Sequence, residues 1–227
     1  MSFIKKILPN PLKKSMKKLL GIKKPKKGFE GSKIYWENRY VNYRDSGPGS
    51  YGRLADFKAE ILNSFVKENN IKTVIEYGCG DGNQLSLSNY LKYIGYDVSN
   101  KAIAICENRF SNDSTKQFKI ISSENKIYEK AELTLSLDVL FHLIEDEVFN
   151  EYMQRLFESS TKYVIIYSSN YEAFIAPHVR CREFTKWISA NVSENWALQQ
   201  KIDNRYPFDE EDPDNTSFAD FYIYKRM

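Results

Sequence analysis

Apolar positions along the chain alternate between helical stripes and short continuous runs. Apolar residues at 54, 57, 61, 62, 65 and 66 recur at the helical period and predict a helix over 54–69. Similar spacing predicts helices over 33–43, 83–91, 99–109, 146–158 and 183–192. Short apolar runs predict strands over 73–77, 93–97, 117–121, 132–138 and 162–167, then an extended segment over 196–202 and an aromatic strand over 218–224.

The predicted strands and helices alternate from residue 73 to residue 167. This order predicts an α/β fold in which a parallel sheet carries helices on both faces, with right-handed crossovers. Residues 46–52 (SGPGSYG) have the Gly, Pro and Ser density of a loop, and residues 209–214 (DEEDPD) predict an exposed acidic loop.

The composition fits one folded domain with an appendage. The chain has 227 residues, and 42% of them are hydrophobic, which is enough for a sizeable core. Its three cysteines, Cys79, Cys106 and Cys181, lie far apart and form no CxxC pair. We therefore expect no disulfide framework, no metal site and a reducing, cytoplasmic setting.

The positive charge is concentrated at the N-terminus. Residues 1–27 hold ten lysines and no acidic residue, so the remainder carries a net charge of −7 within an overall +3. We expect a basic extension over 1–29 and a single domain over 30–227, and no nucleic-acid partner, because the domain itself is not basic. After Pro11 an amphipathic helix is predicted, which fits either peripheral contact with an anionic inner membrane or a solvated tail.

A glycine-rich stretch follows the first predicted strand. Residues 73–85 read TVIEYGCGDGNQL, with Gly78, Gly80 and Gly82 behind Glu76. In an open parallel sheet such a loop lines the ligand site, and glycine lets a ligand approach the backbone closely. Asn83 stands where the dinucleotide fingerprint GxGxxG needs its last glycine, which disfavours a nicotinamide oxidoreductase.

Three stretches together resemble the class I S-adenosylmethionine-dependent methyltransferases: EYGCGDG, YIGYDVS and SLDVLFHLIED. The resemblance implies a Rossmann-like, seven-stranded mixed sheet of order 3-2-1-4-5-7-6 with the last strand antiparallel. It also implies S-adenosylmethionine as cofactor and S-adenosylhomocysteine as product. With KIYWENRY and SGPGSYG included, the sequence is similar to methyltransferases encoded among bacterial capsule and lipopolysaccharide genes.

The resemblance also implies the residues that hold the cofactor. Asp97 is expected to accept the ribose hydroxyls, Glu76 to brace the glycine loop, and Ser123 or Glu124 to meet the adenine. Tyr35, Trp36, Arg39 and Tyr40 are expected to form a lid, with Arg39 paired to the cofactor carboxylate. The other residues expected at the cofactor are Tyr77, Gly78, Cys79, Gly80, Asn83, Gln84, Val98, Asp138 and Val139.

Two histidines bear on catalysis and on the acceptor. His142 follows Asp138 by four residues and, with an unperturbed pKa of about 6.5, suits a general base; loop packing is the alternative. His178, Arg180 and Arg182 alternate in APHVRCREF and predict a grip on a phosphate or carboxylate of the acceptor, against a solvated basic loop. Arg44 and Tyr51 are further candidates for acceptor contact.

The expected function is O-methylation of a small sugar, nucleotide sugar or phosphorylated group. The region after the fourth strand lacks the [DNS]PP[YFW] signature of amino-methylating enzymes that act on nucleic-acid bases, and no HxH pair suggests a metal. A non-catalytic cofactor-binding scaffold at the inner membrane is the alternative from another class, and a methyltransferase for an unrelated metabolite is a third reading.

Overall fold

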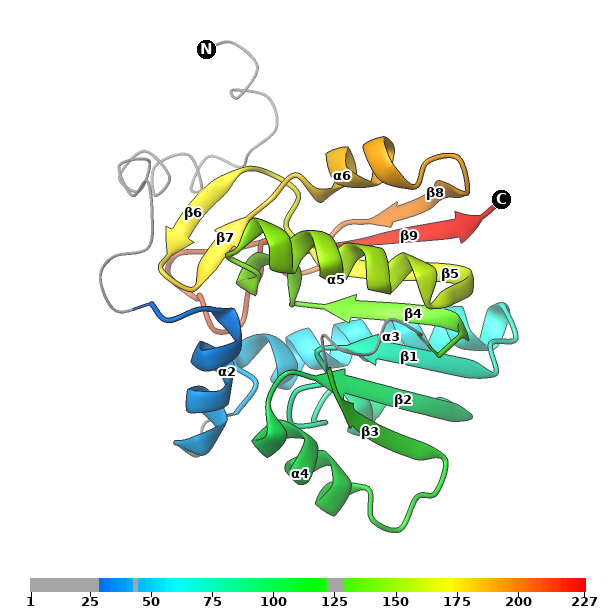
Figure 1. The fold of residues 1–227 in the computed structure, drawn as a ribbon, viewed down its shortest axis with the longest axis horizontal. Helices are drawn as coiled ribbons and strands as arrows, with labels where there is room; N and C mark the ends of the chain where they lie inside the picture. The colour runs from blue at the N-terminus through cyan, green and yellow to red at the C-terminus, as the bar shows by residue number, and fades with distance from the viewer. Residues whose placement is uncertain (1–28, 43–44, 122–128) are drawn as a thin grey trace.

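The structure, a computed structural model, describes residues 29–42, 45–121 and 129–227. The predicted amphipathic helix near Pro11 lies outside these residues. Seven strands form the main sheet, in the order β3-β2-β1-β4-β5-β9-β8 (Figure 1). They are β1 (Thr73–Tyr77), β2 (Lys92–Asp97), β3 (Lys116–Ile120), β4 (Ala131–Leu137), β5 (Ser160–Ser168), β8 (Trp196–Ile202) and β9 (Asp220–Arg226).

The sheet has the predicted topology. Strands β1 to β5 pair in parallel, and β9 pairs antiparallel with both β5 and β8. Counted within the sheet, β8 is the sixth strand and β9 the seventh, so the predicted order 3-2-1-4-5-7-6 is confirmed. The parallel strands place their carboxyl ends along one edge, where ligands bind in such folds.

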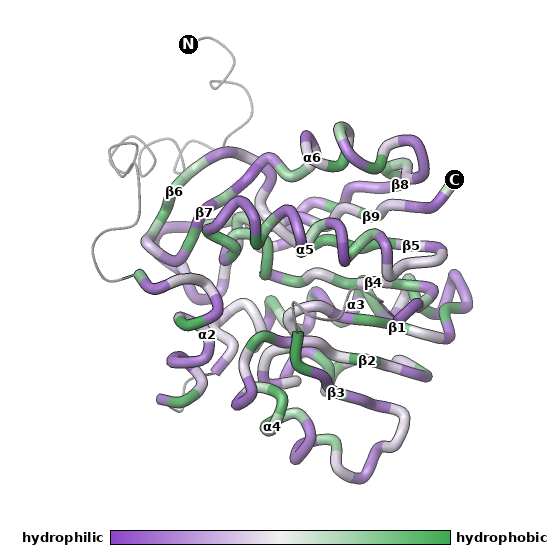
Figure 2. The backbone as a smooth tube through the Cα atoms, viewed as in Figure 1, coloured by the Kyte–Doolittle hydropathy of each residue, from purple (hydrophilic) through white to green (hydrophobic). Residues whose placement is uncertain are grey.

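Two hydrophobic layers cover the two faces of the sheet. Alternate residues of β1 point to opposite faces, so Val74 packs with α3 and α4 while Ile75 packs with α5 and α6. Figure 2 shows hydrophobic residues recurring along β1, β4 and β5, whereas the edge strand β8 is largely hydrophilic. The helices are α2 (Ser32–Val41), α3 (Gly52–Glu68), α4 (Asn100–Arg109), α5 (Asp146–Glu158) and α6 (Phe184–Asn191).

The prediction of a helix over 83–91 is wrong. Only a single 3₁₀ turn forms there, at Leu85–Leu87. The polar side chains of this segment bond to other parts of the chain: Asn83 Nδ2 donates to the Ser50 carbonyl and Gln84 Nε2 to the Ala55 carbonyl. Such bonds compete with helix formation, and here they tie the segment to the loop before α3 and to α3 itself.

A small hairpin was not predicted. Strands β6 (Ala173–Ala176) and β7 (Val179–Cys181) form a separate two-stranded sheet after β5. Figure 1 places this hairpin at the same end of the molecule as α2. No helix in the described part of the chain is long and apolar enough to cross a bilayer.

Candidate active site

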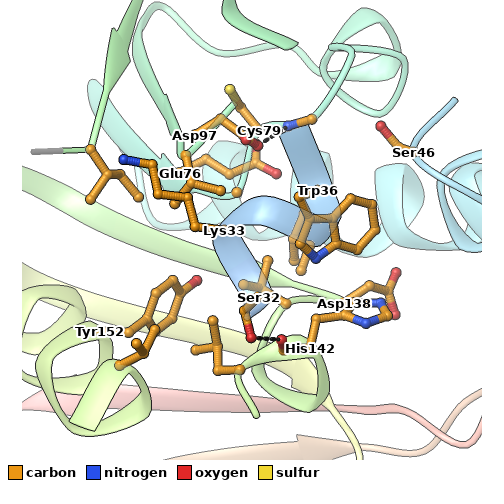
Figure 3. A pocket seen from close by; sticks show the side chains of 18 of the residues that line it. Ser32, Lys33, Trp36, Ser46, Glu76, Cys79, Asp97, Asp138, His142 and Tyr152 are labelled. Atoms are coloured by element: carbon orange, nitrogen blue, oxygen red, sulfur yellow. Dashed lines mark hydrogen bonds between the residues drawn. The ribbon is translucent and has the colours of Figure 1, made fainter. Parts of the chain in front are cut away.

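A cavity of about 470 Å³ lies at the carboxyl ends of β1, β2 and β4. The glycine loop after β1 forms one wall, the segment after β4 forms another, and α2 covers the opening (Figure 3). Figure 3 shows Glu76 and Asp97 on one side of the cavity and Asp138 with His142 on the other. The cavity therefore occupies the place where the sequence predicted a cofactor.

Glycine is required at two positions of the loop by close packing. A Cβ at Gly78 would lie 2.4 Å from Val139 Cγ2, and one at Gly80 would lie 2.4 Å from Ser46 Oγ. Both residues also have positive φ, 86° and 58°, which side chains rarely adopt. The glycines thus let the segments before α3 and after β4 close directly onto the loop.

Asp97 ties the end of β2 to the glycine loop. Its Oδ2 accepts the Gly80 N–H at 3.0 Å, and its Oδ1 accepts the Ser99 N–H at 2.9 Å. Burial raises the pKa of this carboxyl to about 6, although the backbone hydrogen bonds pull it the other way. At neutral pH Asp97 is a carboxylate that lines the cavity and has lone pairs left to accept hydrogen bonds from a ligand.

Glu76 is buried beside Asp97 at the end of β1. Burial raises its pKa to about 7, opposed by the hydrogen bond from Tyr93 Oη to Oε2 at 2.8 Å and by the charge of Lys58. The predicted bracing role stays a prediction, but the side chain does join β1 to β2 through Tyr93.

Asp81 fastens the covering segments and was not singled out from the sequence. Its Oδ2 accepts the Tyr51 hydroxyl at 2.5 Å and the Ser46 N–H at 3.2 Å, while Oδ1 accepts the Asn83 N–H at 3.0 Å. Tyr51, predicted to contact the acceptor, is therefore held by Asp81. The only available signal for Asp81 was its place inside GCGDG.

The two amides after the loop have different positions. Gln84 lines the cavity, whereas Asn83 points to the Ser50 carbonyl and to Arg109 and is not among the lining residues. Cys79, Val98 and Val139 also line the cavity. Tyr77 is buried away from it, with its hydroxyl 2.6 Å from Ser159 Oγ.

Helix α2 contributes an aromatic cover. Trp36 lines the cavity and meets the His142 ring edge-on at 4.8 Å. Tyr35 stacks on His178 at 4.4 Å, outside the cavity. Ser32 anchors the helix, since its N–H donates to Glu145 Oε1 at 2.9 Å and its hydroxyl lies 2.8 Å from the His142 carbonyl.

Arg39 does not face the cavity, which corrects its predicted pairing with the cofactor carboxylate. Its Nε donates to the Asp45 carbonyl at 2.8 Å, and its Nη2 lies 3.4 Å from Asp45 Oδ1. The guanidinium also lies 5.5 Å from the Trp36 ring centroid. Arg39 is thus engaged with Asp45 rather than with the ligand side.

Lys58 brings a positive charge into the cavity wall. It lies in α3 with its side chain 1% exposed, and its Nζ is 2.5 Å from Asp138 Oδ2. The sequence carries a signal for this position: Lys58 is four residues from both Leu54 and Leu62, so it shares the buried face of the helix. Asp138 itself follows β4 with a φ of 60°.

His142 lies in the 3₁₀ turn after β4 and lines the cavity. Its Nδ1 is 3.0 Å from the His178 carbonyl oxygen, so Nδ1 carries the proton and Nε2 keeps a lone pair. Burial lowers its pKa to about 4, opposed by the hydrogen bond to the His178 carbonyl and assisted by the nearby charge of Arg39. The ordinary pKa near 6.5 assumed from the sequence is therefore corrected, and the ring is neutral at physiological pH.

Arg180 and Arg182 are occupied by the protein, which corrects their predicted role in gripping a phosphate. Both donate to Asp146 Oδ1, at 2.9 and 2.5 Å. Both also donate to the Ile144 carbonyl, and Arg182 reaches the Leu143 carbonyl as well. His178 supplies its carbonyl to His142 and does not line the cavity.

Three predicted contacts fall outside the described residues: Arg44, Ser123 and Glu124. Within the residues that the structure describes, no group of His, Cys, Asp and Glu side chains is arranged to hold a metal ion.

The buried carboxyl of Glu76 should make stability depend on pH. Its folded-state pKa of about 7 exceeds the unfolded value near 4.3, so the native state binds more protons between these values and stability falls as pH rises. Glu76→Gln removes this term. We expect the variant to gain stability relative to the wild type, by roughly 3 kcal/mol, between pH 4.5 and pH 8. Thermal denaturation across this range measures the gap.

The exposed Glu68 of α3 provides the matched control. Glu68→Gln should leave the gap to the wild type unchanged across the same range. A gap for Glu76→Gln that does not vary with pH would contradict the assignment.

Arg182 should matter for stability rather than for acceptor affinity. Arg182→Ala leaves the Leu143 carbonyl without its guanidinium donor and the Ile144 carbonyl with Arg180 alone, which should cost about 2–4 kcal/mol of unfolding free energy in urea titrations. Arg205 pairs with Glu60 on the surface, so Arg205→Ala should change stability little. Equal stability of the two variants would leave Arg182 available for a ligand role.

Solved structures share this architecture. The N-methyltransferase NodS from Bradyrhizobium japonicum WM9, in complex with S-adenosylhomocysteine, is 13% identical with a TM-score of 0.66; the alignment covers 87% of this chain and 99% of that one. Magnesium protoporphyrin IX methyltransferase from Synechocystis PCC 6803, with bound S-adenosylhomocysteine, is 12% identical with a TM-score of 0.63, covering 86% and 98%. The methyltransferase domain of bacterial CtHen1-C is 20% identical with a TM-score of 0.57, covering 74% and 96%.

No protein-family model and no curated protein matches the sequence. At these identities the likeness concerns the fold. The chain has the Rossmann-like α/β fold of S-adenosylmethionine-dependent methyltransferases, with its seven-stranded mixed sheet flanked by helices.

Proposed function

We propose that this chain is an S-adenosylmethionine-dependent methyltransferase whose catalytic domain is residues 30–227. The observation that carries the proposal is Asp97, a buried carboxylate that ends β2, bonds the glycine loop through Gly80 and still lines the cavity. Two of the structures named above that share this fold were solved with S-adenosylhomocysteine.

The cavity fits this cofactor. Asp97 accepts one backbone N–H on each oxygen, which leaves acceptor capacity for two ribose hydroxyls. The backbone of Gly78 and Gly80 would hold the amino-acid part, and Val98, Ile121 and Leu143 offer apolar surface for the adenine. S-adenosylmethionine would supply a methyl group on a sulfonium sulfur, activated for transfer to a nucleophile.

His142 would serve the acceptor. Its Nε2 lone pair is fixed by the Nδ1 bond to the His178 carbonyl, so Nε2 can take the proton of an acceptor hydroxyl. The lowered pKa keeps the ring unprotonated at neutral pH, so that Nε2 is free to accept a proton, and it also makes the ring a weaker base. Trp36 and the aromatic cover of α2 would keep water away from this position.

The acceptor we propose is a small sugar, nucleotide sugar or phosphorylated group of surface polysaccharide synthesis, methylated on oxygen in the cytoplasm. The support is the sequence resemblance to methyltransferases of capsule and lipopolysaccharide genes. The engagement of Arg180 and Arg182 with Asp146 removes the arginine pair that favoured a phosphate. Residues 1–27, with ten lysines, would bring the domain to an anionic membrane surface.

A cofactor-binding scaffold without catalysis is the second candidate. The Nε2 of His142 on the cavity wall favours catalysis over it, since a pure binding site has no need for an oriented proton acceptor.

Calorimetry should show binding of S-adenosylhomocysteine and not of NAD. Asp97→Asn should weaken S-adenosylhomocysteine about 10- to 100-fold, because charge-assisted bonds to the ribose are lost. Asp113, which is half-buried and does not line the cavity, is the control, and Asp113→Asn should bind like the wild type. Binding of NAD alone would overturn the proposed cofactor.

His142→Asn should slow methyl transfer about 10²- to 10⁴-fold without changing S-adenosylhomocysteine affinity. The asparagine amide can still donate toward the His178 carbonyl, so the loop is preserved while the base is lost. Transfer is followed as a mass gain of one methyl group on a pool of nucleotide sugars, sugar phosphates and unphosphorylated sugars. An unchanged rate would remove His142 as the base, and wild-type protein that binds the cofactor but methylates nothing would favour the scaffold.

A further inference from the structure

Lys58 is a buried side chain that has, among the residues that the structure describes, one carboxylate within hydrogen-bond reach. Its Nζ lies 2.5 Å from Asp138 Oδ2 and 5.3 Å from the centroid of the Tyr167 ring. A lysine this deeply buried is uncommon, because removing an ammonium from water costs several kcal/mol unless it is well compensated. A buried ion pair of this kind is weak evidence for stability, so its place on the cavity wall calls for another explanation.

Asp138 is held in an unfavourable backbone conformation. Its φ of 60° belongs to the left-handed region, and it is one of two such residues other than glycine in the described chain. Its N–H bonds the Tyr167 carbonyl at 2.9 Å, and Gly49 packs so closely that a Cβ there would lie 3.0 Å from Oδ2. Strain of this kind persists where the surroundings enforce it, which is most often at a functional site.

The sheet order places this pair opposite Asp97. Asp97 follows β2 and Asp138 follows β4, and these strands flank β1, which carries the glycine loop. Both Lys58 and Asp138 line the cavity together with Gly78, Gly80 and Glu76. A ligand with its ribose at Asp97 and its base toward Ile121 therefore presents its other end to Lys58 and Asp138.

We propose that Lys58 and Asp138 recognise the amino-acid end of the cofactor, Lys58 binding the α-carboxylate and Asp138 the α-ammonium. This inference rests on the proposed cofactor. A neighbouring cation and anion complement a zwitterion, and each gains a partner without leaving the other unpaired. Lys58 takes the role predicted for Arg39, which is engaged with Asp45 outside the cavity. The pair would make the cavity selective for ligands that keep the amino acid.

The test compares two ligands by calorimetry, S-adenosylhomocysteine and 5′-methylthioadenosine. Both contain adenosine and sulfur, but only the first carries the amino acid. The full-length wild type should bind S-adenosylhomocysteine at least tenfold more tightly. Lys58→Met should weaken S-adenosylhomocysteine about 10- to 100-fold and leave 5′-methylthioadenosine within about twofold, so that the selectivity collapses.

Two further variants keep the test decisive if Lys58→Met fails to fold. Lys58→Arg retains the charge and should keep most of the selectivity, while the double variant Lys58→Met/Asp138→Asn leaves no unpaired buried charge and should lose it. Lys67→Met, on the exposed side of α3, is the control and should behave like the wild type.

The possible failures are distinguishable. Equal weakening of both ligands, or unchanged selectivity in Lys58→Met and in the double variant, overturns the assignment of Lys58. A wild type that binds both ligands equally overturns it too, while leaving the proposed cofactor in place. A wild type that binds neither ligand overturns the cofactor and this inference together.

Discussion

The carboxyl edge of the sheet is organised by the need to compensate three carboxylates at the ends of adjacent strands. Each charge removed from water must be hydrogen-bonded, paired or neutralised. Asp97 accepts hydrogen bonds from two backbone N–H groups. Glu76 has a raised pKa and accepts a hydrogen bond from the Tyr93 hydroxyl, and Asp138 forms an ion pair with Lys58. These partners come from the glycine loop, β2 and α3, so satisfying the carboxylates also fixes the walls of the cavity.

The cover of the cavity depends on the same loop. Asp81, inside the glycine motif, holds the chain at Ser46 and Tyr51, and Gly80 has no side chain that would block Ser46. Tyr40 at the end of α2 joins the Ser46 hydroxyl at 2.9 Å. A motif that the sequence presents as a ligand-binding loop is therefore also the anchor for the segments that close over it, and this explains the need for glycine at Gly80.

The sequence predicted the sheet well because periodicity reports burial directly. The central strands are buried on both faces and read as apolar runs. Asp97 was singled out through the resemblance carried by YIGYDVS, and the structure places it at the end of β2, on the cavity wall. Side chains that depend on distant partners were less accessible. Lys58 was missed because its partner lies 80 residues away, and the helix over 83–91 failed because Asn83 and Gln84 bond to segments before β1. Spacing along the chain carries no information about such contacts.

The arginines after β5 show how an incorrect assignment still leads to the site. Arg182 does not face a ligand, but its bonds to the carbonyls of Leu143 and Ile144 hold the segment that begins with His142. The β6–β7 hairpin directly before Arg182 supplies the His178 carbonyl that sets the His142 tautomer. Since Asp146 at the start of α5 draws both arginines toward that helix, the orientation of the proposed base is determined by the hairpin. The arginines and His178, which were expected to bind the acceptor, thus contact the segment of His142 and position its ring instead.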